Sequence, residues 1–359
     1  MAAAAADDAR GAAARLEAIW RDGGPAQWLL RPLALLHAAL VGLRRALYRA
    51  GLRRRERLPV PVIVVGNRVA GGAGKTPVTI ALVQALRQAG RRPGIVSRGH
   101  GRSHTGTIRE VQPADTAADS GDEPLLMRRR TGAPVVVGRD RAAAARELLA
   151  RHPDTDVIVC DDGLQHLRLA RDIEIVVFDE RGAGNGWLLP AGPLREPVDA
   201  PPAGRVQLVV LNTDRTEPPP GAPPGERSRR QLGRPVPLAD WWRGTPSDTA
   251  LTDEAAWAAL RGRRLLASAG TGQPARFFDA LRAHGLEIDT LALDDHHDHM
   301  TLPWPASATE VLVTEKDAVK LDPARLAAER PGLQVQVVPL ELQLPAALIA
   351  AVLQALPAR

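Results

Sequence analysis

The chain has 359 residues, of which 45% are hydrophobic and 25% charged, an ordinary globular composition with enough length for two domains. A single cysteine, Cys160, excludes a disulfide framework and suits a reducing cytosol. Aromatic residues make up only 3% of the chain, which argues against base-stacking platforms, so no nucleic-acid partner is expected.

The net positive charge of +6 is concentrated at the N-terminus, because residues 1–58 hold 11 arginines and five acidic residues. Six leucines in this segment recur at helical spacing, and a cluster of arginines follows them. The leucines are Leu29, Leu33, Leu36, Leu40, Leu43 and Leu47, and the arginines are Arg44, Arg45, Arg49, Arg53, Arg54, Arg55 and Arg57. The pattern predicts an amphipathic helix that lies in an anionic membrane interface.

Three alternatives compete for residues 28–57. A transmembrane span needs about 20 uninterrupted apolar residues, whereas Arg31, Pro32 and His37 interrupt this stretch. A secretory signal fits poorly, because acidic residues occur among the first 15 and the arginine cluster follows the apolar run. The third alternative, a helix that packs its leucines on its own domain, stays open beside the membrane interpretation.

An apolar strand beginning at Val62 runs into a glycine-rich turn that ends in Gly74, Lys75 and Thr76. Glycines let backbone N–H groups surround an anion, a lysine places charge on the β and γ phosphates, and a threonine can bind Mg2+. Val69 replaces the first glycine of the consensus, but helical spacing of apolar residues follows as required. A plain glycine-rich turn would leave the lysine unexplained. The predicted nucleotide-binding residues are Gly71, Gly72, Ala73, Gly74, Lys75, Thr76 and Pro77.

Lysine is rare in this chain. Only Lys75, Lys316 and Lys320 occur among 47 basic residues, and every other basic residue is arginine. At Lys75 a compact ammonium group fits between phosphates where a planar guanidinium would not. The three lysines therefore mark positions at which arginine is disfavoured.

Beyond the loop, strand and helix patterns alternate, which predicts an α/β fold with a mostly parallel sheet and helices on both faces. A proline-rich stretch at 217–225 predicts a linker or surface loop, and a second α/β segment begins near Leu265. We expect a membrane-associating segment at 1–58, a P-loop NTPase-type core at 59–235 and a smaller C-terminal α/β domain at 236–359. The expected strands lie at 93–96, 134–137, 157–160, 172–178, 311–313 and 335–338.

Two carboxylates follow the apolar run at 157–160. Asp161 and Asp162 stand at the end of this predicted strand, where a carboxylate can lie beside Mg2+ bound at the phosphate loop. A capped turn after a strand is the alternative. The phosphate loop already indicated favours the metal role, without deciding which of the two acids binds directly.

Motifs from residue 28 to the C-terminus occur in the order of a known family. They are Arg-Ala-Leu-Tyr at 45–48, Gly-Gly-Ala-Gly-Lys-Thr-Pro at 71–77, Ser-Arg-Gly at 97–99, Gly-Asp-Glu-Pro-Leu-Leu at 121–126, Asp-Asp-Gly-Leu-Gln-His at 161–166, Gly-Asn-Gly at 184–186, Leu-Leu-Pro-Ala-Gly-Pro-Leu-Arg-Glu-Pro at 188–197, Arg-Phe-Phe at 276–278, Asp-His-His at 295–297 and Thr-Glu-Lys-Asp-Ala-Val-Lys at 314–320. The chain thus resembles the tetraacyldisaccharide 4'-kinase family of lipid A biosynthesis.

The resemblance implies ATP-dependent phosphorylation of the 4'-hydroxyl of a tetraacyldisaccharide 1-phosphate, with ATP and Mg2+, at the cytoplasmic face of the bacterial inner membrane. It implies that Asp122 and His296 act together as the base that takes the hydroxyl proton. Arg195 would stabilise phosphate charge beside Lys75, and Glu196 would join Thr76 and the two aspartates near the metal. The implied substrate-binding residues are Ser97, Arg98, Glu123, Gln165, His166 and Asn185.

Simpler interpretations exist for several of these residues. Asp122 precedes Glu-Pro and an apolar run, so it could be a helix N-cap. The acidic and histidine-rich run at 294–299, which includes His296, suggests a transition-metal site when taken alone. Arg195 and Glu196 could be surface-loop residues.

Two other classes of protein have a similar glycine-rich loop or bind nucleotides at a membrane. A deviant-Walker ATPase of the partition type would carry a signature lysine where this chain has Ala70. A GTP-binding module would need Asn-Lys-x-Asp, which neither the run beginning at Asn212 nor Lys316 followed by Asp317 provides. A P-loop regulatory module at the membrane therefore remains only as the alternative to the kinase.

Overall fold

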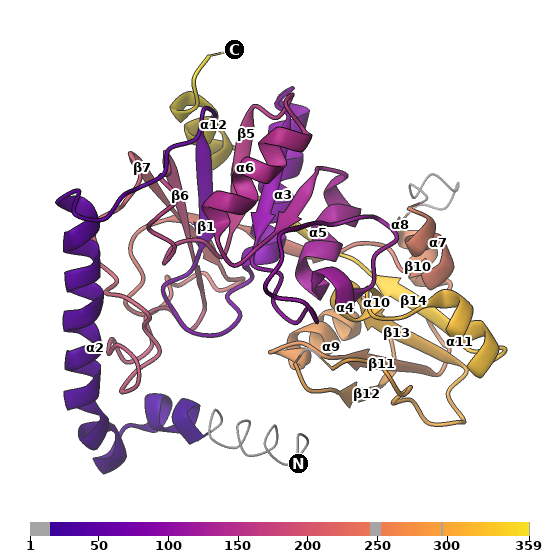
Figure 1. The fold of residues 1–359 in the computed structure, drawn as a ribbon. Coiled ribbons are helices and arrows are strands. Elements are labelled where there is room, and N and C mark those ends of the chain that lie inside the picture. The colour runs from indigo at the N-terminus through magenta and orange to yellow at the C-terminus, as the bar shows by residue number, and fades with distance from the viewer. Residues whose placement is uncertain (1–14, 245–252, 296, 359) are drawn as a thin grey trace. The chain divides into compact units, whose positions relative to one another are not determined.

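The computed structural model describes residues 15–244, 253–295 and 297–358 (Figure 1). Its chain forms two compact units, each built from segments that are distant in the sequence. The first unit comprises 1–78, 155–229 and 344–359, and the second comprises 79–154 and 230–343. These units do not coincide with the three consecutive segments expected from the sequence, so the division at 58 and 235 stays a prediction.

The first unit is organised around a parallel sheet with the strand order β5-β1-β6-β7-β8. At its centre, Ile63 of β1 is level with Val159 of β5 and Ile173 of β6. All residues of these three strands are buried, as expected for parallel strands covered on both faces. The elements are α2 (Pro25–Arg49), β1 (Val62–Gly66), β5 (Val157–Asp161), β6 (Ile173–Asp179), β7 (Val206–Asn212), β8 (Glu226–Arg227) and α12 (Ala346–Ala355).

Helix α3 (Lys75–Gln88) starts directly after the glycine-rich loop and carries the chain from the first unit into the second. Its apolar residues Ile80, Leu82, Val83 and Leu86 are all buried, as their helical spacing predicts. The strand, loop and helix order expected from the sequence is therefore confirmed.

The second unit begins with three strands in the order β3-β4-β2. Strand β4 is parallel to β2 and antiparallel to the short β3. Helix α6 starts at an N-cap, Asp140, whose carboxylate accepts hydrogen bonds from two backbone N–H groups of the first turn. The elements of this part are β2 (Pro93–Ser97), β3 (Arg109–Glu110), α4 (Ala117–Ser120), α5 (Asp122–Thr131), β4 (Val135–Val137) and α6 (Arg141–Arg151).

The rest of the second unit contains a five-stranded sheet with the order β10-β14-β13-β11-β12, and β15 pairs with β9 in a separate two-stranded sheet. Alternate residues of β13 enter different cores: Leu312 packs with Phe277 and Trp257, whereas Val311 packs with Leu238 and others. Helices therefore cover both faces. The elements are β9 (Arg229–Leu232), β10 (Val236–Pro237), α7 (Leu238–Arg243), α8 (Asp253–Ala258), β11 (Leu265–Ala269), α9 (Pro274–Ala283), β12 (Ile288–Ala292), β13 (Glu310–Thr314), α10 (Glu315–Ala318), α11 (Pro323–Glu329), β14 (Gln334–Val338) and β15 (Leu340–Gln343).

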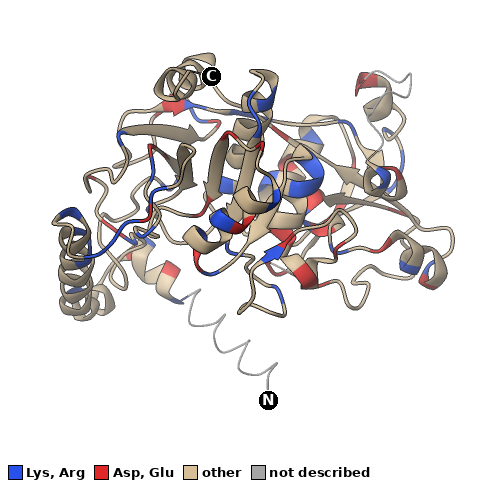
Figure 2. Ribbon diagram, turned by 45° about the horizontal axis from the view of Figure 1, so that its top comes forward, with Lys and Arg blue, Asp and Glu red and all other residues tan. Residues whose placement is uncertain are grey.

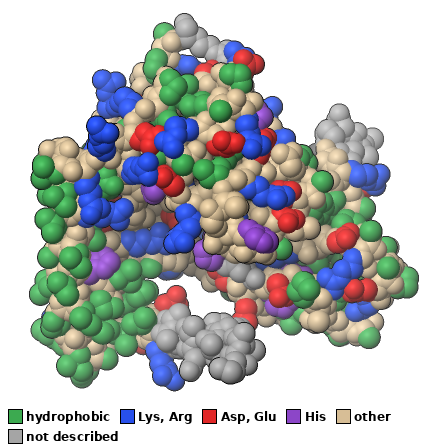
Figure 3. Space-filling view, viewed as in Figure 1, with side chains coloured by type: hydrophobic (Ala, Val, Ile, Leu, Met, Phe, Trp, Pro, Cys, Tyr) green, Lys and Arg blue, Asp and Glu red, His purple; other side chains and the backbone are tan. Residues whose placement is uncertain are grey.

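Helix α2 leaves most of its leucine stripe uncovered. Leu29, Leu33, Leu36, Leu40 and Leu43 are 55–79% exposed, and hydrophobic side chains cover the outer surface of α2 at the left of Figure 3. The alternative in which these five leucines pack on their own domain is therefore wrong. By length and composition α2 could also cross a membrane, since its most apolar window has a mean hydropathy of 1.3, a test that core helices and signal sequences pass too.

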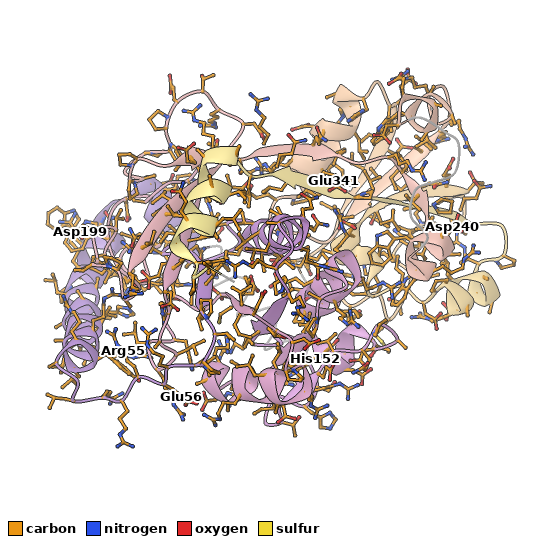
Figure 4. The ribbon with its side chains drawn as sticks, turned by 90° about the horizontal axis from the view of Figure 1, so that it is seen from above. Arg55, Glu56, His152, Asp199, Asp240 and Glu341 are labelled. Carbon is orange, nitrogen blue, oxygen red and sulfur yellow. The ribbon has the colours of Figure 1, made fainter. Side chains whose placement is uncertain are left out.

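Basic residues gather at the C-terminal end of α2 and in the segment that follows it (Figure 2). Arg49, Arg53 and Arg54 are exposed. The segment is fixed by backbone hydrogen bonds between Glu56 and residues 168 and 170, and Arg55 and Glu56 are labelled in Figure 4. A fixed basic segment thus continues from an exposed apolar stripe.

Candidate active site

The glycine-rich loop between β1 and α3 places Lys75 at the first residue of α3. Gly71 and Gly74 have φ angles of +87° and +77°, in the region that favours glycine. A Cβ atom on Gly74 would lie 2.0 Å from Nδ2 of Asn212, so any other residue would strain the backbone and displace that amide. The loop conformation therefore depends on glycine at a named position, as a phosphate-binding loop requires.

Two asparagines brace this loop. The amide of Asn67, directly after β1, donates to the carbonyl oxygens of Val69 and Gly71 at 2.6 and 3.1 Å. Asn212, the last residue of β7, donates to the carbonyl oxygen of Ala73 at 3.0 Å. These contacts fix carbonyl groups on both sides of the loop. Neither asparagine belongs to a motif that predicts a role in the loop, although each stands at the carboxyl end of a parallel strand, where functional residues gather.

Charged groups converge beside Lys75. Its Nζ lies 3.7 Å from Oδ1 of Asp162 and donates to Oδ1 of Asn67 at 3.3 Å. Nη1 of Arg195 lies 3.3 Å from the same oxygen of Asp162. Asp162 adopts a φ of +49°, unusual for a residue with a side chain and typical of functional sites. The structure thus brings together Lys75, Asp162 and Arg195, which the sequence places in three separate motifs.

Glu196 follows Arg195 and is buried. Its carboxylate accepts hydrogen bonds from Arg45 of α2 and from Nε2 of Gln165, the latter at 3.2 Å. The side chain of Arg45 is only 11% exposed, and it also donates to the carbonyl oxygen of Pro201. The expectation that Arg45 belongs to the membrane-facing cluster is therefore wrong, because a buried carboxylate holds it inside the protein.

Helix α2 contacts the residues around Arg195 elsewhere too. His37 lies 3.3 Å from the carbonyl oxygen of Arg195, and Arg44 donates to the carbonyl oxygen of Gln165 at 3.1 Å. Gln27 donates to the carbonyl oxygen of Ala191 at 3.3 Å. The polar face of α2 is thus bound to the loop that carries Arg195 and Glu196.

The remaining predicted residues of the first unit have different surroundings. Thr76, directly after the loop, and Asp161, the last residue of β5, are both buried. Both ends of the Asn185 amide bond within its own loop, to Ala191 and Trp187, so its role in substrate binding stays a prediction. The carbonyl oxygen of His166 accepts from Nη2 of Arg171 at 2.6 Å, and the role of His166 in substrate binding stays a prediction.

In the second unit, Asp122 is the first residue of α5 and is buried. The N-cap is Gly121, whose φ of +92° favours glycine, so the interpretation of Asp122 as the N-cap is wrong. Oδ1 of Asp122 accepts from the backbone N–H of Glu123 at 2.9 Å. Ser97 is buried at the end of β2 and Arg98 is exposed.

His296 lies outside the described residues. The neighbouring His297 and His299 are described, and Nε2 of His299 lies 3.1 Å from Oδ1 of the buried Asp317. Among the described residues, no group of three or more His, Cys, Asp or Glu side chains could hold a metal ion by itself. A magnesium site assembled from a threonine hydroxyl, a carboxylate, phosphate oxygens and water would not require such a group.

A parallel sheet, a glycine-rich turn and a lysine at the start of the next helix define the chain as an α/β protein of the P-loop type. Comparison with known proteins gives the particular family. The family profile for tetraacyldisaccharide-1-P 4'-kinase matches residues 26–357, and the chain belongs to this family.

Named relatives and a solved structure agree with this assignment. The tetraacyldisaccharide 4'-kinase of Leptothrix cholodnii is 61% identical and covers 97% of both chains. That of Methylibium petroleiphilum is 56% identical, over 90% of this chain and 87% of the relative. The crystal structure of LpxK from Aquifex aeolicus in complex with ATP has a TM-score of 0.74 and 26% identity, covering 92% of this chain and 100% of the other. The predicted fold class is confirmed.

Proposed function

We propose that the protein transfers the γ-phosphate of ATP to the 4'-hydroxyl of tetraacyldisaccharide 1-phosphate in lipid A biosynthesis. The observation that carries this proposal is the convergence of Lys75 and Arg195 on Asp162 beside a glycine-dependent phosphate loop. Membership of the 4'-kinase family supports the acceptor, and the ATP complex of the related LpxK supports the donor. The alternative of a membrane-bound regulatory ATPase is not favoured.

On the donor side, Lys75 and the amide groups of residues 71–77 would bind the β and γ phosphates. Arg195, whose guanidinium is already aimed at this region by its contact with Asp162, would stabilise charge that develops on the transferred group. Because little covalent work falls to the protein in phosphoryl transfer, these contacts position the phosphate and neutralise its charge.

The donor set fits Mg2+, since a threonine hydroxyl and carboxylates are hard oxygen ligands. Thr76 and one of Asp161 and Asp162 would hold it, and when bound it would neutralise phosphate charge. Glu196, whose two oxygens bind Arg45 and Gln165, would act near the metal mainly by holding those side chains in place. The carboxylate of Asp162 is 36% exposed and available for a ligand, whereas Asp161 is buried.

On the acceptor side, Asp122 would take the proton from the sugar hydroxyl and His296 would orient that carboxylate. Ser97, Arg98, Glu123, Gln165, His166 and Asn185 are proposed to contact the acceptor. Asp122 is suited to the role because it is a buried carboxylate at the first turn of α5, where the helix dipole favours its anionic form.

We also propose that the protein is peripheral to the cytoplasmic face of the inner membrane. The exposed leucines of α2 would enter the interface, and Arg49, Arg53 and Arg54 would contact anionic lipid headgroups. The acceptor carries four acyl chains, so the enzyme has to work at the bilayer.

The direct test is an assay of the full-length protein with tetraacyldisaccharide 1-phosphate in mixed micelles, Mg2+ and either ATP or GTP. We expect ATP to give a product heavier by one phosphate, with the new phosphate at the 4' position by NMR. GTP should support far less turnover. A protein that hydrolyses ATP at the same rate with and without the lipid, and forms no bisphosphorylated product, would contradict the proposal.

A further inference from the structure

Two of the three lysines, Lys316 and Lys320, have no part in the chemistry described so far. They lie one helical turn apart, within α10 and two residues after it. Their side chains are only 19% and 6% exposed. Because a lysine is rarely buried without charged or polar partners, those partners indicate what the side chains do.

Each lysine bridges the same two segments of the second unit. Nζ of Lys316 lies 2.9 Å from Oδ1 of Asp295 and 3.9 Å from Oε1 of Glu123. Nζ of Lys320 donates to the carbonyl oxygen of His297 at 2.9 Å and lies 4.0 Å from Oδ2 of Asp122. Asp122 and Glu123 form the start of α5, whereas Asp295 and His297 belong to the stretch made up of the described residues 294–295 and 297–299.

We propose that Lys316 and Lys320 form a double clasp that holds Asp295 and His297 against the first turn of α5, and that Lys320 is thereby a positioning residue for the carboxylate of Asp122. The catalytic part of this inference rests on the proposed function, in which Asp122 takes the proton of the acceptor. The clasp acts through Asp122 and does not itself touch the reacting atoms.

Asp317 is a second carboxylate partner of Lys320. Its fully buried carboxylate lies 3.8 Å from Nζ of Lys320 and accepts from the backbone N–H of Gly270 at 3.0 Å. A Cβ atom on Gly270 would lie 2.7 Å from Oδ1 of Asp317 and 3.4 Å from Cβ of His297, so the end of β11 is closely packed here. The ammonium group therefore has two carboxylates and one carbonyl as fixed partners.

This arrangement explains why the residue is lysine in a chain that otherwise uses arginine. An ammonium group has three donors that point in different directions, whereas the five donors of a guanidinium lie in one plane. Burial lowers the pKa of Lys320, although Asp317 and Asp122 oppose that shift. Burial also acts to lower the pKa of Lys316, but Glu123, Asp122 and Asp295 outweigh it and the net shift is upward.

The first test replaces Lys320 by Met, which keeps the length of the side chain and removes its charge. We expect Lys320→Met to lower kcat on the order of 100-fold, the effect of misplacing a catalytic group by about 1 Å. KM for ATP should hold, because the phosphate loop belongs to the other unit. An unchanged kcat would overturn the proposal.

The pH profile separates positioning from general damage. Lys320 is the cation nearest to Asp122, Lys316 pairs with Glu123 and Asp295, and Asp317 with His299 completes the titratable groups around the two lysines. Removal of one ammonium raises the pKa of a neighbouring carboxylate, so the acid limb of kcat/KM should move to higher pH in Lys320→Met. Lys320→Arg should return the limb toward its original position while kcat stays below that of the wild type. A limb that does not move in Lys320→Met would contradict the role.

A double-mutant cycle with Asp122→Asn makes the test specific. If Lys320 acts through Asp122, Lys320→Met should cost little further in the Asp122→Asn background, because effects within one catalytic unit are not additive. Fully multiplicative losses would overturn the clasp and leave the kinase proposal standing. Wild-type turnover by Asp122→Asn alone would instead overturn the assignment of the base, which is a different failure.

Arg325→Gln is the matched control. Nη1 of Arg325 donates to the carbonyl oxygen of His299 at 3.1 Å, so this cation binds the same stretch, and its hydrogen bonds and ion pairs within the described residues are to His299, Met300 and Glu329 and not to α5. Its kcat should stay near that of the wild type, and a loss equal to that of Lys320→Met would contradict the clasp.

Thermal unfolding checks the fold of each variant. If Lys320→Met does not fold, the more exposed Lys316→Met carries the same cycle with Asp122→Asn, with the same two outcomes.

Discussion

The carboxylate of Asp162 lies 3.7 Å from the ammonium group of Lys75 and 3.3 Å from the guanidinium group of Arg195. The backbone of Asp162 is in the left-handed region. A residue with a side chain pays roughly 1–3 kcal/mol for such a conformation, which persists only where the surroundings enforce it. The strain therefore lies at the residue that links the phosphate loop to Arg195, in agreement with the proposed donor site.

The first residue-scale prediction concerns the proposed base. If Asp122 and His296 act as one unit, the double variant Asp122→Ala with His296→Ala should be hardly slower than the worse single variant. Steady-state kcat with saturating lipid and ATP measures this. Independent residues would instead give losses that multiply.

The second concerns Asp317, the buried partner of Lys320. Burial acts to raise the pKa of Asp317, but hydrogen bonding from His299, the charge of Lys320 and further hydrogen bonds outweigh it, so the pKa lies below its ordinary value. Asp317→Asn leaves a buried cation with one carboxylate fewer, and such a loss typically costs about 3–5 kcal/mol of unfolding free energy. Urea unfolding at neutral pH measures it.

The sign of the pH dependence follows from the lowered pKa. Stability contributed by the ionised Asp317 is fully present above the unfolded pKa, about 3.9, and is lost as pH falls through the lower pKa of the folded state. The difference in unfolding free energy between the wild type and Asp317→Asn should therefore shrink on acidification below about pH 4. A difference that is constant with pH would show that the carboxylate is not ionised in the folded protein.

At this scale, residues with a distinctive chemical pattern could be predicted and those without one could not. Lys75 and Asp162 stand in motifs whose chemistry is readable, and the structure brings them together. Asn67 carries no charge and belongs to no recognised spacing. Arg45 pairs with Glu196 across 151 residues of sequence, so local pattern alone assigns it to the surface cluster.

At the scale of the element, α2 has two faces with different surroundings. Its leucines are exposed, while its polar face binds the loop that carries Arg195 and Glu196. We predict that replacing Arg49, Arg53 and Arg54 with Gln weakens binding to anionic vesicles, by about 1 kcal/mol per residue at most and less at higher salt. KM for vesicle-borne lipid should rise, and ATP affinity should hold.

Arg45→Gln provides the contrasting variant. It removes the cation beside a buried carboxylate, so it should lower thermal stability and kcat and leave vesicle affinity nearly unchanged. Co-sedimentation with vesicles at low and moderate salt distinguishes the two. Vesicle binding that is unaffected by the triple replacement would place the membrane contact elsewhere.

Buried strands were readable from the sequence because both faces are covered and the whole run is apolar. The predicted strands at 93–96, 134–137, 157–160, 172–178, 311–313 and 335–338 all correspond to observed strands. The prediction omits β7 (Val206–Asn212), although its apolar run is a strand signal, and β12 (Ile288–Ala292), whose residues are half-exposed or exposed. Partial burial removes the signal in the second case.

At the scale of the whole molecule, the chain passes between its two units at residues 78/79, 154/155, 229/230 and 343/344. The donor-side residues Lys75 and Arg195 belong to the first unit, and the proposed base Asp122 belongs to the second. Sequence patterns are local, so they predict consecutive domains and cannot show that residues 79–154 group with the C-terminal part. Long-range contacts decide that grouping.

Lys75 is proposed to serve the transfer of phosphate from ATP to the lipid, and the turnover of Lys75→Ala is the decisive measurement of that role. With tetraacyldisaccharide 1-phosphate and ATP, kcat should fall on the order of 100-fold or more, because a group that stabilises charge in the transition state is lost. Far-UV circular dichroism and the unfolding midpoint should match those of the wild type. A folded Lys75→Ala protein with near-normal kcat would contradict the kinase site described above.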